Sequence, residues 1–233
     1  MHIPDGLINA STSVGAGAVA AGGIGVSLRR AAHTLQERQA PLAGLVAAYI
    51  FAVQMLNFPV AAGTSGHLLG GVLAAVLVGP WAAAICVAVV LVVQSLLFAD
   101  GGVTALGLNI TNMAIVGVFG GWAIFQLLRR ALPATKATVM VSSGIAAGIS
   151  VVLAASAFVV EYALGGTGGA SVGTVLAAMG GVHALIGIGE GIITALTVGV
   201  VLGVRPDLVH GAADLQPSLV LEGHPGRQRG EAS

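Results

Sequence analysis

The chain has 233 residues, of which 56% are hydrophobic and only 8% are charged, and its formal net charge is zero. Soluble domains carry about 25% charged residues, so this composition, with a mean hydropathy of +0.98, predicts an integral membrane protein. The lack of a basic excess argues against nucleic-acid binding. The long continuous apolar runs argue against a β-barrel, whose strands alternate in hydrophobicity over about ten residues. We therefore predict an all-α protein whose immediate partner is the lipid bilayer.

Seven apolar segments follow a polar start, separated by arginines, prolines and glycine-rich turns. They cover approximately residues 7–28, 42–58, 66–78, 81–98, 104–128, 138–164 and 175–204. A membrane-spanning helix needs about 20 mostly apolar residues, so the third segment is short for an independent span and is expected to be a half-buried helix within the bundle. The last segment is alternatively expected to begin only near His183.

Basic residues predict the orientation of the chain, because Lys and Arg concentrate in cytoplasmic loops. If all seven segments cross the membrane and the N-terminus lies outside, every basic residue falls on the cytoplasmic side. These residues are Arg29, Arg30, Arg38, Arg129, Arg130, Lys136, Arg205, Arg227 and Arg229. With six spans the pattern breaks. We therefore predict a bundle of about seven transmembrane helices, with the N-terminus outside and the C-terminus in the cytoplasm.

The first six residues, Met1-His2-Ile3-Pro4-Asp5-Gly6, place three nitrogen atoms close together. If the Met1 amine is unmodified, amine and His2 amide can close a five-membered chelate ring, and amide and imidazole Nδ1 a six-membered one. Tetragonal nitrogen sites favour Cu(II) or Ni(II). The alternative is that His2 is an exposed residue at a frayed chain end.

His67 is a candidate for the fourth nitrogen. The predicted topology places it in the first turn of the third segment, on the same outer side as His2, and flanking glycines allow another backbone to approach. A metal-binding imidazole needs an outer partner for its second ring nitrogen. Candidate partners are Thr64, Ser65, Gln94 and Asn109. The alternative is a structural histidine hydrogen-bonded to a neighbouring helix.

Ionisable residues inside the last segment are a second candidate site, because such residues are costly in lipid. Glu190 follows His183 by seven residues, so both can face the same way. They form either a proton or ion relay or a structural polar pair. Asn109, Thr111 and Asn112 in the fifth segment are expected to make hydrogen bonds between helices.

No enzyme motif is present. The sequence lacks His-Glu-x-x-His, a Walker A loop and a nucleophile elbow. We therefore predict no catalytic residues and no organic cofactor, and any ATP-driven work requires a partner subunit.

Together these segments resemble a known family, the CbiM/NikM membrane proteins, which are the substrate-capturing subunits of energy-coupling factor (ECF) transporters for cobalt and nickel. The resemblance covers about residues 1–204. It is carried by residues 1–6, 57–59 (Asn-Phe-Pro), 63–67 (Gly-Thr-Ser-Gly-His), 94–102, 109–113 and 183–187.

The resemblance implies a metal site made by the Met1 amine, the His2 amide and imidazole, and the His67 imidazole. It implies Ni²⁺ or Co²⁺ as transported substrate, and it cannot separate the two. It also implies a transmembrane coupling subunit, cytoplasmic ATPase subunits, often a small accessory membrane protein, and a location in the cell membrane.

We predict that the chain captures the ion for an ATP-driven importer. Residues 1–204 would form the transmembrane metal-binding domain, and residues 205–233 a polar, disordered cytoplasmic tail. Two alternatives are a proton-coupled secondary metal transporter that uses His183 and Glu190, and a membrane metal sensor that does not transport.

Overall fold

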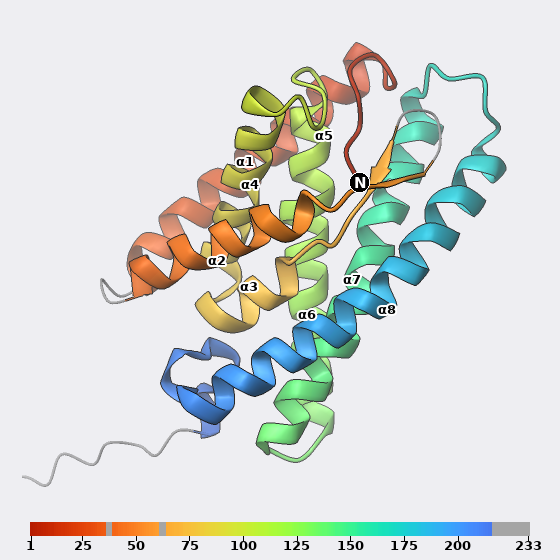
Figure 1. Ribbon diagram of the computed structural model, residues 1–233. Coiled ribbons are helices and arrows are strands. Elements are labelled where there is room, and N and C mark those ends of the chain that lie inside the picture. The colour runs from red at the N-terminus through yellow and green to blue at the C-terminus, as the bar shows by residue number, and fades with distance from the viewer. Residues whose placement is uncertain (36–38, 61–63, 216–233) are drawn as a thin grey trace, which may run out of the picture.

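The structure is a computed structural model that describes residues 1–35, 39–60 and 64–215. Its helices are packed side by side around the N-terminus (Figure 1). They are α1 (Ala10–Thr34), α2 (Ala40–Gln54), α3 (Gly71–Val78), α4 (Pro80–Leu97), α5 (Leu106–Ile110), α6 (Gly121–Ala131), α7 (Lys136–Gly165) and α8 (Val172–Val204). A π-helical stretch, η2 (Thr111–Gly120), joins α5 to α6, so residues 106–131 form one continuous span.

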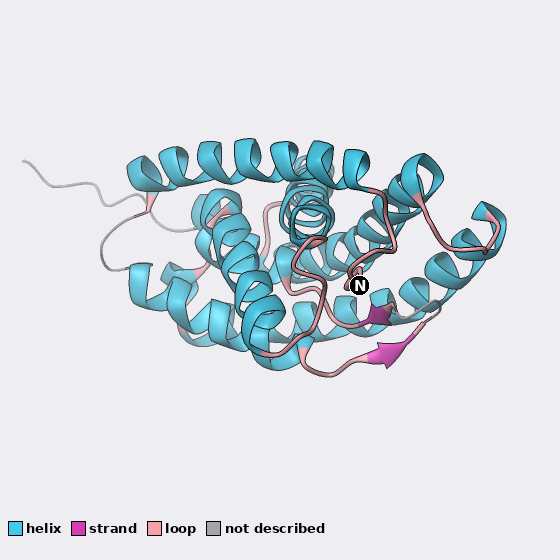
Figure 2. Cartoon of the chain, turned by 90° about the horizontal axis from the view of Figure 1, so that it is seen from above, coloured by secondary structure: helices cyan, strands magenta, loops and turns pink. Residues whose placement is uncertain are grey.

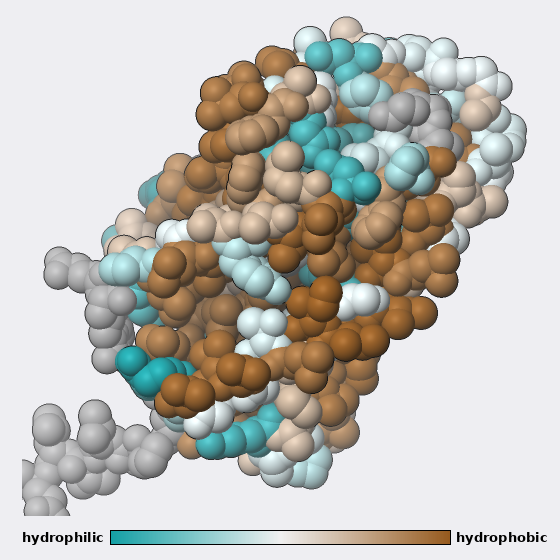
Figure 3. Space-filling model, in the orientation of Figure 1, coloured by the Kyte–Doolittle hydropathy of each residue, from teal (hydrophilic) through white to brown (hydrophobic). Residues whose placement is uncertain are grey.

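The expectation of an all-α membrane protein is confirmed. Within the described ranges, five helical spans are long and apolar enough to cross a membrane: α1, α4, the α5–η2–α6 unit, α7 and α8. Hydrophobic residues cover the middle of the face seen in Figure 3, and hydrophilic residues gather toward its upper and lower parts. The orientation across the membrane stays a prediction. Three of the basic residues used for it, Arg38, Arg227 and Arg229, lie outside the described residues.

The third segment differs most from expectation. Helix α3 has only eight residues, all of them buried rather than half-buried. At 1.5 Å per residue it is about 12 Å long, less than half of the roughly 30 Å hydrocarbon core. Whether this segment crosses the membrane stays a prediction.

His67 was expected in the first helical turn of this segment, and that expectation is wrong, because α3 begins only at Gly71. Gly70 adopts a left-handed conformation with φ of 73°. Residues 65–66 instead form strand β2 (Ser65–Gly66), antiparallel to β1 (Phe58–Pro59).

Polar side chains set the beginnings of the long helices. The Asn9 side chain accepts a hydrogen bond from Thr12 N–H, and Thr135 and Ser171 cap α7 and α8 in the same way. Helix α8 therefore starts at Val172, and the alternative start near His183 is wrong. Helices α7 and α8 pack closely, since a Cβ on Gly148 would lie 2.9 Å from the Gly187 carbonyl oxygen.

The N-terminus lies among the helices (Figure 2). Met1 and Ile3 are buried, at 1% and 0% exposure. Farther along, Ile8 forms an isolated bridge with Gly166, and Asn9 N–H donates to the Gly165 carbonyl at 2.7 Å. The alternative of a frayed chain end is therefore wrong.

Part of the predicted tail is ordered. Two short 3₁₀ helices, η3 (Pro206–Leu208) and η4 (His210–Leu215), follow α8, and Val209 is fully buried. An ion pair of 2.7 Å joins Asp214 to Arg129 of α6. The packed part of the chain therefore extends beyond residue 204. The division into a membrane domain and a cytoplasmic tail stays a prediction, and residues 216–233 lie outside the described residues.

Candidate metal site

The first five residues are held in place by hydrogen bonds to two later residues, Asn109 and Thr104. Ile3 N–H donates to Asn109 Oδ1 at 2.9 Å, and Asn109 Nδ2 donates to the Ile3 carbonyl at 3.3 Å. Two residues on, the Asp5 carboxylate accepts hydrogen bonds from the backbone and hydroxyl of Thr104. These contacts leave residues 1 and 2 at the buried end of an anchored segment.

His2 and His67 meet in the interior, as the prediction of a shared site requires. Their ring centroids are 4.5 Å apart, and the rings are inclined by 29°. His2 is 4% exposed and His67 is fully buried. The turn after α4 packs against them, since a Cβ on Gly101 would lie 3.0 Å from His2 Nδ1.

The backbone selects one tautomer of His67. Its Nδ1 lies 2.8 Å from the Leu68 carbonyl oxygen. A carbonyl only accepts, so Nδ1 carries the proton and Nε2 presents a lone pair. No described residue hydrogen-bonds to this buried Nε2. The expectation that Thr64, Ser65, Gln94 or Asn109 partners the ring is wrong; the partner is a backbone carbonyl.

Burial keeps the nitrogen donors uncharged. Desolvation lowers the pKa of the Met1 amine well below its usual value, although the negative charge of Asp100 opposes this. Desolvation is the main cause that lowers the pKa of His2 to about 3. The pKa of His67 is lowered in the same direction, chiefly by burial. At neutral pH all three groups therefore carry lone pairs, as metal ligands must.

Glu190 fixes the segment that carries His67. Its two carboxyl oxygens accept hydrogen bonds from Leu69 N–H at 2.8 Å and Gly70 N–H at 2.7 Å. Gln54 Nε2 donates to the Leu69 carbonyl from the opposite side, at 2.8 Å. Helices α8 and α2 thus hold the extended chain between β2 and α3, which favours the structural reading of Glu190 over a relay.

His183 is also buried, but it is not joined to Glu190 by a hydrogen bond in the described structure. Its Nδ1 lies 2.8 Å from the Met179 carbonyl oxygen, and its Nε2 has no described partner. It lies near the strand that leads to His67, because a Cβ on Gly66 would be 3.6 Å from its Cε1.

The expected hydrogen bonds between helices are confirmed for two residues. Asn112 Nδ2 donates to Glu161 of α7 at 2.7 Å, and the Thr111 hydroxyl donates to the Ala16 carbonyl of α1 at 2.9 Å. Asn109 instead holds Ile3. The sequence did not indicate this, because the partner is a backbone group.

Side chains alone do not complete a metal site. In the part of the chain that the structure describes, no three His, Cys, Asp or Glu side chains form a group that could hold a metal ion. A site at His2 and His67 therefore depends on the amine and amide nitrogens of the chain start.

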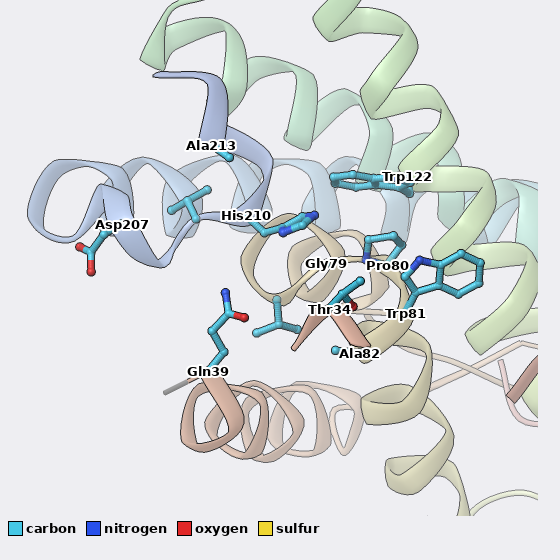
Figure 4. A pocket seen from close by; sticks show the side chains of 12 residues that line it. Thr34, Gln39, Gly79, Pro80, Trp81, Ala82, Trp122, Asp207, His210 and Ala213 are labelled. Atoms are coloured by element: carbon cyan, nitrogen blue, oxygen red, sulfur yellow. The ribbon is translucent and has the colours of Figure 1, made fainter. Parts of the chain in front are cut away.

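A separate cavity of about 500 Å³, lined by residues at the end of α3 and in η4, lies at the end of the bundle away from the N-terminus (Figures 1 and 4). It is bordered by Trp81, Trp122 and His210, and the His210 ring lies 5.7 Å from that of Trp122. His210 is the one imidazole among its described lining residues, so this cavity offers no convergent nitrogen donors.

Comparisons with known proteins point to metal transport. The model of the CbiM family, described as a cobalt uptake substrate-specific transmembrane region, matches residues 2–208. The chain is similar to the cobalt transport protein CbiM of Sorangium cellulosum, with 32% identity over 90% of this chain and 94% of that protein. It is 37% identical to the fused nickel transport protein NikMN of Rhodobacter capsulatus, over 70% of this chain and 47% of that protein.

The fold is similar to that of a solved transition metal transporter. The two share 30% identity with a TM-score of 0.82, over 93% of this chain and all of that one.

Proposed function

This chain belongs to the CbiM family of cobalt and nickel uptake membrane proteins, and from that premise we propose that it captures Ni²⁺ or Co²⁺ at the Met1, His2 and His67 nitrogens. The observation that carries the proposal is the stacked pair of buried imidazoles beside a buried, uncharged chain terminus. The ion is the transported substrate and is later released toward the cytoplasm.

The donor set explains the class of ion. The Met1 amine and the imidazoles offer lone pairs without losing a proton, whereas the His2 amide must lose its proton to bind. Ions high in the Irving–Williams order displace that proton best, so Ni²⁺ outcompetes Mn²⁺ and Fe²⁺. Cu²⁺ also suits these donors, so metal availability contributes to selectivity.

Transport by this chain requires partners. The sequence contains no phosphate-binding loop, so ATP hydrolysis is assigned to cytoplasmic ATPase subunits acting through a transmembrane coupling subunit. A nickel transport relative is a fused protein of greater length, which supports a small accessory membrane protein as a further partner. The assembly is placed in the cell membrane, with the metal site facing outward.

Metal titration of the purified full chain tests the site. We expect His2→Ala and His67→Ala each to weaken Ni²⁺ binding by about 100-fold or more, because each removes a nitrogen ligand. His210→Ala removes a histidine from the opposite end of the bundle and is the matched control. Wild-type affinity in either of the first two variants would show that the ion binds elsewhere.

Transport in vesicles separates this function from secondary transport. We expect uptake to require ATP and the partner subunits, and to be insensitive to a proton gradient. Proton-driven uptake without ATP would instead favour the relay role of His183 and Glu190.

A further inference from the structure

A cavity of about 380 Å³ opens beside His2, between the N-terminal segment and the turn that follows α4. We call it the vestibule and define it by five of its lining residues. These are His2, Asp5, Ser65, Ser95 and Asp100. His2 belongs both to this cavity and to the proposed nitrogen site, so the two are adjacent.

Two polar atoms of the vestibule lack a partner. Ser95 is 5% exposed, and no described residue hydrogen-bonds to its hydroxyl. The same holds for the Ser65 hydroxyl. Buried polar groups are nearly always hydrogen-bonded. These two hydroxyls therefore indicate a polar occupant of the vestibule.

The charge of the vestibule selects a cation. The Asp100 carboxylate lies 3.4 Å from His2 Nε2 and accepts a hydrogen bond from Asn57 Nδ2 at 2.9 Å. Asp5 supplies a second carboxylate on the wall. The residues that line the vestibule include no Lys or Arg. Two carboxylates without a basic partner in the lining attract positive charge.

The size of the vestibule fits an ion that still carries its water. A divalent first-row ion in oxygen coordination is surrounded by about six waters. At about 30 Å³ of liquid volume each, these waters need roughly 180 Å³. The cavity volume of about 380 Å³ is ample for the hydrated ion.

We propose that the vestibule binds the hydrated divalent metal ion, through its coordinated waters, before the ion reaches the nitrogen site. Asp100, Ser65 and Ser95 accept hydrogen bonds from these waters. Each nitrogen donor then replaces one water, which leaves through the cavity, and the proton of the His2 amide passes to a departing water. This proposal rests on the proposed capture of the ion by Met1, His2 and His67.

Rapid-mixing kinetics with Ni²⁺ alone and the purified full chain test the proposal. We expect Asp100→Asn to lower the association rate constant about tenfold and to weaken its dependence on salt, because the variant removes the attracting charge. Asp214→Asn is the matched control, since it removes the same charge at η4 near the other end of the bundle. An unchanged association rate in Asp100→Asn, with faster dissociation, would overturn the vestibule and leave Asp100 as a residue that only orients His2.

Ser95→Ala is a second, milder test. The Ser95 hydroxyl makes no hydrogen bond to a described residue. The variant should therefore keep the thermal stability of the metal-free protein. We expect its association rate to fall about threefold, the size of one modest hydrogen bond. A wild-type rate in Ser95→Ala would count against the vestibule. If the wild-type chain bound no Ni²⁺ at equilibrium, the proposed function itself would fail. If the wild type bound Ni²⁺ and the association rates of Asp100→Asn and Ser95→Ala equalled the wild-type rate, only the vestibule would be overturned.

Discussion

The two ends of the bundle each combine a cavity with a histidine, but they differ in what surrounds the imidazole. At the N-terminal end, His2 and His67 stack beside a chain terminus, and His67 Nε2 has no described hydrogen-bond partner. At the other end, His210 lies alone beside Trp122 (Figure 4). Convergence of lone pairs, rather than the presence of a histidine, is therefore what makes the N-terminal end the candidate metal site.

The two ends also differ in how the histidine is held. Long-range hydrogen bonds to the backbone, from Asn109 to Ile3 and from Glu190 to Leu69 and Gly70, position the first pair. His210 sits in a short 3₁₀ helix attached through the Asp214–Arg129 ion pair. Rigid support is expected where ligand geometry determines affinity.

The largest effect should come from moving the chain terminus. One glycine added before Met1 displaces the amine, and Met1 is itself buried, at 1% exposure. We expect Ni²⁺ affinity to fall by about 100-fold or more, because the Met1 nitrogen becomes an amide that must lose a proton to bind, and the new amine lies one residue farther from His67. Calorimetric titration measures it, and a glycine added after Ser233 is the control. Retained affinity in the N-terminally extended protein would show that binding does not need an amine at the position of Met1.

A smaller loss of Ni²⁺ affinity should follow when the segment that carries His67 loses a hydrogen bond to Glu190. Glu190→Gln replaces one of the two acceptor oxygens with an NH2 group, which cannot accept the hydrogen bond from Leu69 N–H or Gly70 N–H. We expect a 10–100-fold loss of Ni²⁺ affinity, as for other groups that orient metal ligands. Glu161→Gln is the matched control, because that buried carboxyl also loses a charge but is bonded to the Asn112 side chain. Equal losses of Ni²⁺ affinity in both variants would mean that the affinity depends on a buried carboxyl in general, and not on the hydrogen bonds from Leu69 and Gly70 to Glu190.

The pH dependence of Ni²⁺ binding tests whether the buried nitrogen donors at the N-terminal end are uncharged. With the pKa of His2 near 3 and that of the Met1 amine lowered by burial, only the His2 amide has a proton to lose at pH 7. We expect about one proton released per Ni²⁺, and affinity that rises about tenfold per pH unit between pH 5 and 8.

A synthetic peptide of residues 1–6 provides the comparison for this measurement. Its amine and imidazole have ordinary pKa values of about 8 and 6.5, so it should release about two protons at pH 7. Calorimetry in buffers of different ionisation enthalpy counts them. Two protons from the folded protein would contradict the uncharged donor set.

The smallest effect is expected at the other end of the bundle. His210→Ala should leave Ni²⁺ affinity unchanged and lower the free energy of unfolding by about 0.5–1.5 kcal/mol, through loss of the ring contact with Trp122. Thermal unfolding in detergent measures this. A weakened metal affinity would show that the two ends are coupled.

Composition and segment length determined the class of this protein and most of its helices. The apolar runs located α4, α7 and α8 to within about three residues, because the bilayer demands long hydrophobic stretches regardless of tertiary contacts. The run for α1 ended six residues too early. His2 and His67 could be chosen as candidate ligands because ring nitrogens are a property of the side chain.

Only the tertiary structure shows how these two candidate ligands are held in place. Glu190 reaches the backbone of Leu69 and Gly70 from about 120 residues away, and the Leu68 carbonyl sets the tautomer of His67. Backbone N–H and C=O groups are the same at every residue, so the sequence cannot indicate which of them a side chain binds. For the same reason the short α3 and the extended chain before it could be recognised only once Glu190 and Gln54 were seen to satisfy that backbone.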